Sequence, residues 1–127
     1  MKKILIVDDD AAISESIEDI LKQESFEVDI IDHLDGAVAF IKNIKPDLVL
    51  LDVMFPGNPS GGFDLARDIR KDSELGDLPV MFITSVNKEF PMDFSIKDIG
   101  NEWFPAQDFI EKPIDFNELV KKIKNLI

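Results

Sequence analysis

Four apolar segments of the chain are each followed by polar residues that could do chemistry if folding brought them together. In chain order these residues are Asp8 and Asp9, Asp52, Thr84 and Ser85, and Lys112 with Pro113. Three carboxylates in one cleft repel one another unless a cation lies among them. Oxygen ligands without histidine or thiolate suit Mg²⁺. With a lysine ammonium opposite, such a site leaves room for a dianionic group, which predicts chemistry on a phosphoryl group.

The segments before these residues have the pattern of buried strands. Strands are predicted at residues 3–7, 27–32, 48–54, 80–84 and 109–111. The first of them does not alternate between apolar and polar residues, which indicates burial on both faces. The spacing of apolar residues predicts helices at residues 12–23, 34–43, 63–71 and 116–127, with a further short helix near residues 95–99.

This order of elements predicts the fold class. Strands that alternate with helices favour an α/β fold with a doubly wound, five-stranded parallel sheet and helices on both faces. In that architecture the ligand site lies at the carboxyl ends of the strands. The polar residues that follow the strands are therefore expected at one edge of the sheet.

The composition is that of one acidic globular domain. The chain has 127 residues, of which 45% are hydrophobic, and 14 basic against 26 acidic residues give a net charge of −12. Such a charge repels nucleic-acid phosphates, so no direct nucleic-acid binding is expected, and it favours divalent cations and basic partner surfaces. The absence of cysteine excludes disulfides, thiolate metal sites and a cysteine nucleophile.

No targeting segment or membrane-spanning segment is recognisable in the sequence. The longest wholly apolar run, residues 37–41, has five residues, which is too short to span a bilayer. The apolar run near the N-terminus is too short for a signal peptide. We therefore expect a cytoplasmic protein with no membrane contact.

Four sequence segments together resemble response regulator receiver domains. They are residues 4–10 (ILIVDDD), 50–56 (LLDVMFP), 82–85 (FITS) and 109–113 (FIEKP). Each segment alone is common, but all four in order, each at a predicted strand end, are specific. The resemblance implies one receiver domain over residues 1–127 with no output domain, and a flavodoxin-like strand order 2-1-3-4-5. It also implies a phosphoprotein of two-component phosphorelay signalling that is not a conventional enzyme, although it promotes its own phosphotransfer and dephosphorylation.

The resemblance assigns an acceptor and a metal site. Asp52 matches the residue that becomes an aspartyl phosphate, and Asp9 matches the direct Mg²⁺ ligand. Asp8 matches the acid that holds Mg²⁺ through water, and Met54 the residue that contributes its backbone carbonyl. A carboxylate oxygen that attacks a phosphoramidate in line gives an acyl phosphate, which fits these roles.

The resemblance also assigns a switch. Thr84 matches the hydroxyl that moves toward the phosphoryl oxygen, and Lys112 the ammonium that pairs with the acceptor and then with the phosphate. Phe109 matches the aromatic residue that rotates inward afterwards. A cis peptide bond is implied before Pro113, the residue type that tolerates one.

The implied partners are a histidine kinase or a histidine phosphotransfer protein, an unknown downstream protein and, in some relatives, a second copy as a homodimer. The interval of 28 positions from Thr84 to Lys112 is longer than is usual in the family. The extra residues fall where the face for dimerisation or target binding normally lies. The route by which the signal leaves the domain therefore stays open.

Two alternative functions remain. Asp8 could be the nucleophile of a haloacid-dehalogenase-type phosphatase, although Ala12 stands where that family has Thr or Val. The chain could also be a receiver-like interaction module that works without phosphorylation. A simpler structural role is open for each residue as well: Asp8 to Asp10 could only cap a helix, and Phe109 could only fill the core.

Overall fold

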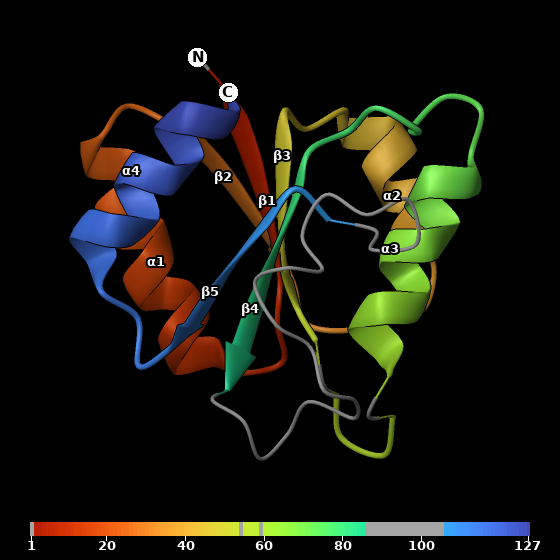
Figure 1. Ribbon diagram of the computed structural model, residues 1–127, viewed down its shortest axis with the longest axis horizontal. Coiled ribbons are helices and arrows are strands. Elements are labelled where there is room, and N and C mark those ends of the chain that lie inside the picture. Colours follow the sequence, from red (N-terminus) through yellow and green to blue (C-terminus); the bar gives the residue numbers. More distant parts are fainter. Residues whose placement is uncertain (1, 54, 59, 86–105) are drawn as a thin grey trace.

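The computed structural model describes residues 2–53, 55–58, 60–85 and 106–127. In this part of the chain, strands and helices alternate up to the third helix, and the last two strands precede the last helix (Figure 1). The elements are β1 (Lys3–Val7), α1 (Ala11–Gln23), β2 (Glu27–Ile31), α2 (Ala37–Ile44), β3 (Leu48–Asp52), α3 (Gly61–Lys71), β4 (Val80–Ser85), β5 (Asp108–Lys112) and α4 (Phe116–Leu126).

The strands form one parallel sheet of five strands in the order β2-β1-β3-β4-β5. Helices α1 and α4 cover one face of the sheet, and α2 and α3 cover the other (Figure 1). Both the predicted fold class and the strand order implied by the resemblance are confirmed.

The register of the strands brings their carboxyl ends to one edge. Val7 pairs with Leu51, so the residues after β1 lie beside the end of β3. Asp52 pairs with Ile83 of β4, and Ser85 pairs with Lys112 of β5. This edge therefore collects the polar residues that the sequence places after each strand.

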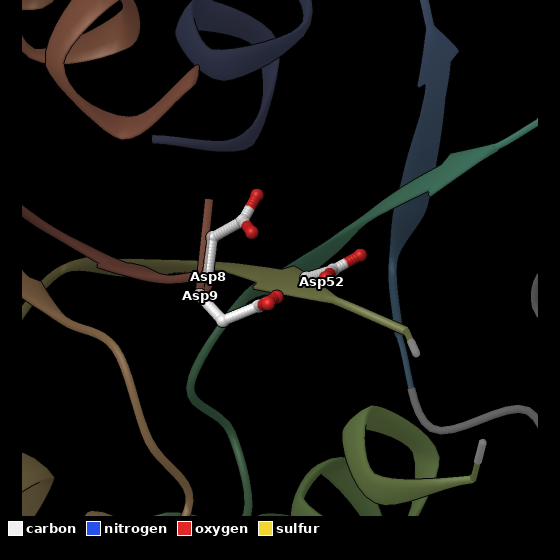
Figure 2. A group of neighbouring side chains, drawn as sticks. All are labelled: Asp8, Asp9 and Asp52. Atoms are coloured by element: carbon white, nitrogen blue, oxygen red, sulfur yellow. The ribbon is translucent and has the colours of Figure 1, made fainter. Parts of the chain in front are cut away.

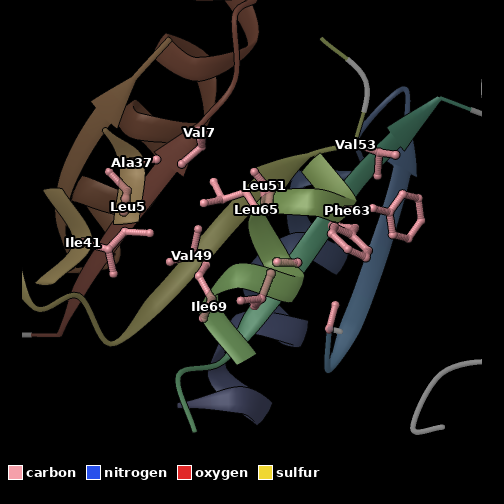
Figure 3. Close-up of a cluster of buried hydrophobic side chains, with 14 of the residues drawn as sticks. Leu5, Val7, Ala37, Ile41, Val49, Leu51, Val53, Phe63, Leu65 and Ile69 are labelled. Atoms are coloured by element: carbon pink, nitrogen blue, oxygen red, sulfur yellow. The ribbon is translucent and has the colours of Figure 1, made fainter. Parts of the chain in front are cut away.

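Each face of the sheet has its own hydrophobic core. In β1, Leu5 and Val7 face the core under α2 and α3 (Figure 3), whereas Ile4 and Ile6 face the core under α1 and α4. Residues Leu48 to Leu51 of β3 are all fully buried. Burial on both faces explains why the central strands are continuously apolar.

The predicted helix at residues 34–43 begins three residues too early. The structure places Gly36 in the left-handed region at φ 72°, and the Ala37 amide donates to the Leu34 carbonyl at 3.1 Å. This turn keeps Leu34 packed against the core without making it helical. The helix expected near residues 95–99 lies outside the described residues, as does Met54.

Two aspartates explain where α1 and α4 begin. Asp10 accepts a hydrogen bond from the Ile13 amide at 3.2 Å. Asp115 accepts from the amides of Asn117 and Glu118. Side-chain acceptors at this position satisfy amides that have no partner within the helix. Among the described residues, no helix is long and apolar enough to cross a membrane.

Candidate functional site

Three carboxylates meet at the carboxyl edge of the sheet. Asp8 and Asp9 directly follow β1, and Asp52 is the last residue of the neighbouring strand β3. One carboxylate oxygen from each residue lies within 4.8 Å of the others, and Figure 2 shows the three side chains gathered at these strand ends. We call Asp8, Asp9 and Asp52 the acidic cluster.

The members of the acidic cluster differ in burial. Asp8 is 1% exposed and Asp52 is 6% exposed, whereas Asp9 is exposed. Oδ1 of Asp8 accepts a hydrogen bond from the Asp10 amide at 2.9 Å. Within the described part of the chain, Oδ2 of Asp8 is buried and has no hydrogen-bond partner.

This environment changes the acidity of Asp8. Burial raises the pKa of the Asp8 carboxyl above its ordinary value, because the charged form loses its hydration. The Asp10 amide and the positive charge of Lys112 act in the opposite direction, and the negative charges of Asp9 and Asp10 raise the pKa further. The site is therefore electrostatically unfavourable to the charged Asp8.

Lys112 supplies a cation to this cluster from the end of β5. Its Nζ lies 3.8 Å from Oδ2 of Asp8 and 3.8 Å from Oδ1 of Asp52. The side chain is only 20% exposed. The peptide bond between Lys112 and Pro113 is cis, as the resemblance implies. One ammonium thus faces two buried carboxylates at the same distance.

Thr84 lies at the same edge of the sheet. It follows Ile83, the residue of β4 that pairs with Asp52, and it is 3% exposed. Thr84 is therefore a buried residue one position beyond the register partner of Asp52.

Phe109 lies in β5 and packs, partly buried, against the core under α2 and α3. Nζ of Lys122 in α4 lies 5.9 Å from the centre of its ring and 3.2 Å from Oδ1 of Asp108. The helical pattern gives no indication that the Lys122 side chain reaches β5.

The donor set of the acidic cluster fits a small divalent cation. Among the described residues, three carboxylates gather here and the ammonium of Lys112 faces two of them, so negative charge predominates in this part of the structure. The buried Oδ2 of Asp8 lacks a hydrogen-bond donor among the described residues, and 3.8 Å from Lys112 is too long for a hydrogen bond. The three candidate ligand side chains all offer carboxylate oxygen atoms, the type that Mg²⁺ prefers.

The loop after Asp52 is closed by backbone hydrogen bonds that the sequence did not predict. Phe55 and Asn58 form an antiparallel bridge across Gly57, which has φ 73°. The Gly62 amide at the start of α3 then donates to the Val53 carbonyl at 2.9 Å. The density of Pro and Gly at residues 56–62 predicts a loop, but not that it folds back onto the end of β3.

Comparisons with known proteins agree with the observed fold. Residues 4–124 match the family model described as the response regulator receiver domain. The phosphate regulon transcriptional regulatory protein PhoB of Pseudomonas aeruginosa is 37% identical to this chain, over 99% of the chain and 52% of that protein. The chain thus spans about half the length of the curated relatives it matches.

Two solved structures illustrate the likeness in three dimensions. The receiver domain of NtrX from Brucella abortus is 30% identical and superposes with a TM-score of 0.78, covering 97% of this chain and 96% of that one. The chemotaxis response regulator CheY4 of Vibrio cholerae, 22% identical, shares the fold with a TM-score of 0.81 over 100% of this chain and 99% of that one.

Proposed function

Because the chain belongs to the response regulator receiver domain family and is the receiver domain of a two-component response regulator, we propose that Asp52 accepts a phosphoryl group in a Mg²⁺-dependent reaction. The donor is a phosphohistidine of a histidine kinase or a histidine phosphotransfer protein. The observation that carries the proposal is the placement of Lys112 Nζ, 3.8 Å from both Asp8 and Asp52, beside the acidic cluster.

Asp52 acts as the nucleophile. One of its carboxylate oxygens forms a bond to phosphorus while the bond between phosphorus and the donor's imidazole nitrogen breaks. The product is an acyl phosphate on Asp52 and a neutral histidine on the donor, which takes its proton from solvent. Asp52 is 6% exposed, so the donor must approach along the carboxyl edge of the sheet.

Asp8, Asp9 and Asp52 are the side chains that would hold Mg²⁺, with the Met54 carbonyl as a further ligand that the resemblance implies. When bound, Mg²⁺ supplies positive charge to the phosphoryl oxygens and offsets the repulsion among the carboxylates. Asp9 is the exposed member of the cluster, and Asp8 is the buried member whose Oδ2 has no hydrogen bond among the described residues.

Lys112 and Thr84 handle the charge that arrives with the phosphoryl group. The Lys112 ammonium pairs with the Asp52 carboxylate before transfer and with a phosphoryl oxygen after it, without leaving the end of β5. The Thr84 hydroxyl donates a hydrogen bond to another phosphoryl oxygen. Phe109, two residues into the adjacent strand β5, then rotates inward, and this movement changes the surface that a downstream protein recognises.

The family match favours Asp52 over Asp8 as the nucleophile. Asp8 is 1% exposed, and its Oδ1 already accepts a hydrogen bond from the Asp10 amide. A phosphatase that uses Asp8 would need this carboxylate to reach its substrate. The phosphorylation-independent alternative is less well supported, because the acidic cluster, Thr84 and Lys112 lie together at one edge.

The test is transfer of a phosphoryl group from acetyl phosphate with Mg²⁺, followed by the intact mass of the chain. The wild-type chain gains one phosphoryl group, and Asp52→Asn gains none. Asp32→Asn is the matched control, because Asp32 follows β2 of the same sheet but has a 79% exposed side chain, and this variant reacts like the wild type. Equal phosphorylation of Asp52→Asn and the wild type would contradict the proposal.

A further inference from the structure

The first turn of α3 lies directly on the backbone at the end of β3. The Gly62 amide donates to the Val53 carbonyl at 2.9 Å. A Cβ built on Gly62 would overlap the carbonyl oxygen of Asp52 and would lie 2.6 Å from the Cα of Val53. Real Cβ atoms do not approach backbone so closely, so only glycine fits this position without movement.

The adjacent Gly61 meets a different kind of obstacle. A Cβ on Gly61 would approach side-chain atoms, Cδ1 of Leu34 and the amide of Asn58. Leu34 is only partly buried and Asn58 is exposed, so these side chains can rotate away. Gly61 and Gly62 therefore form a matched pair: the same substitution in the same helical turn meets side chains in one case and the acceptor's own backbone in the other.

We propose that Gly62 is a positioning residue for phosphorylation, because its lack of a side chain lets α3 fix the backbone of Asp52 and Val53. This inference rests on the proposed role of Asp52. The direction of the Asp52 carboxylate depends on its backbone, and that backbone is held from both sides. The Val53 amide donates to the Ile83 carbonyl of β4 at 3.2 Å, and the Val53 carbonyl accepts from Gly62.

Neither α3 nor β3, the two elements that meet at this contact, can move without loss of packing. Helix α3 buries Phe63, Leu65, Ala66 and Ile69 in the core, and β3 is hydrogen-bonded between β1 and β4. A Cβ at position 62 would press directly on the backbone of Asp52 and Val53, where these two elements meet. An alanine at position 62 therefore displaces the segment that carries the acceptor.

The experiment compares Gly62→Ala with Gly61→Ala and the wild type. Circular dichroism establishes the folded fraction, and the rate of Asp52 phosphorylation by acetyl phosphate with Mg²⁺ is measured per folded molecule. Gly62→Ala is expected to react about tenfold more slowly or worse, since misplacing a reacting group by about 1 Å costs up to about 100-fold. Gly61→Ala is expected to react within about twofold of the wild type, as the control at an adjustable side-chain contact.

A second measurement covers the case in which Gly62→Ala does not fold. In the wild-type chain, binding of beryllofluoride with Mg²⁺ is followed by the amide resonances of both glycines. Because the Gly62 amide is hydrogen-bonded to the Val53 carbonyl, we expect a larger change in chemical shift for Gly62 than for Gly61. A folded Gly62→Ala that reacts at the wild-type rate, or a Gly62 resonance that stays in place when beryllofluoride binds, would overturn the inference. A wild-type chain that takes no phosphoryl group would refute the proposed function instead, and the inference would fall with it.

Discussion

Asp8 combines deep burial with a charge that nearby groups compensate only in part. Burial raises its pKa, and Asp9 and Asp10 add further repulsion. In the described part of the chain, the favourable contacts of Asp8 are the Asp10 backbone amide and the Lys112 ammonium at 3.8 Å. Residues held in unfavourable surroundings at functional sites lower the stability of the chain. The metal-free protein is therefore expected to be less stable than a variant that lacks the buried charge of Asp8.

Replacing Asp8 with asparagine tests how far the buried charge lowers the free energy of unfolding. Asp8→Asn removes the buried charge and keeps the acceptor for the Asp10 amide, so the free energy of unfolding in EDTA at pH 7 should rise by about 1 kcal/mol. The same variant should lose its response to Mg²⁺. Urea unfolding measures both effects. Asp32→Asn serves as the control, and a variant less stable than the wild type would show that Asp8 is well accommodated.

The stability that Asp8→Asn gains over the metal-free wild type should depend on pH in a definite direction. Because the pKa of Asp8 is raised in the folded chain, the folded state binds a proton more readily than the unfolded state. The contribution of Asp8 to the free energy of unfolding therefore falls as the pH rises from the ordinary value of 3.8 through the raised pKa. The advantage of Asp8→Asn over the metal-free wild type should be absent at acidic pH, grow through that window and then level off. An advantage that shrinks with rising pH would contradict the assigned direction.

Residue types and their order predicted which groups meet at the site, but not how each is held. Asp8, Asp9, Asp52 and Lys112 lie together because each stands at a strand end, which the sequence shows. Asp8 is buried while the adjacent Asp9 is exposed, and this difference is set by tertiary packing that no local pattern encodes.

At the scale of elements, the apolar strands were the most predictable part because they are buried on both faces. The helix boundaries were less predictable, since backbone geometry sets them. Gly36 delays the start of α2, and Gly61 and Gly62 let α3 begin two residues before the predicted range. Contacts between elements, such as that of Lys122 with Phe109, join residues too far apart in sequence for periodicity to reveal.

Gln107 joins three elements at the end of the sheet away from the acidic cluster. Its Oε1 accepts from Nη2 of Arg70 in α3 and from the Val80 amide at the start of β4, each at 2.7 Å. The backbone amide of Gln107, which directly precedes β5, donates to the Val80 carbonyl. One side-chain oxygen therefore fixes how α3, β4 and β5 come together.

Gln107→Leu should lower the free energy of unfolding by about 1–2 kcal/mol, because a guanidinium and a backbone amide both lose their acceptor. Chemical denaturation provides the measurement. Gln107→Glu keeps the acceptor oxygen and adds a charge opposite to that of Arg70, so it should retain the wild-type stability. If both variants lose stability equally, the shared acceptor is not the source of the effect.

At the scale of the whole molecule, the net charge of −12 makes the chain self-repelling and attractive to cations. Any salt reduces this repulsion by screening. A cation bound in the acidic cluster would in addition stabilise the fold by mass action, because the unfolded chain lacks the site. Screening and specific binding can therefore be distinguished by comparing different salts at the same ionic strength.

MgCl₂ should therefore raise the Tm of the wild-type chain more than NaCl at equal ionic strength. The difference should disappear in Asp8→Asn, whose remaining acidic residues still give a strongly negative molecule. Thermal unfolding followed by circular dichroism measures the shift. A Mg²⁺ effect of equal size in the two proteins would indicate general screening in place of a specific site.

The acceptor itself is identified most directly by chemical trapping. After reaction with acetyl phosphate and Mg²⁺, borohydride reduces an acyl phosphate to the corresponding alcohol, and peptide mass spectrometry locates the changed residue. We expect modification of Asp52 alone. Modification of Asp8, or a chain that stays unmodified under conditions in which it is folded, would contradict the assignment of Asp52 as the acceptor.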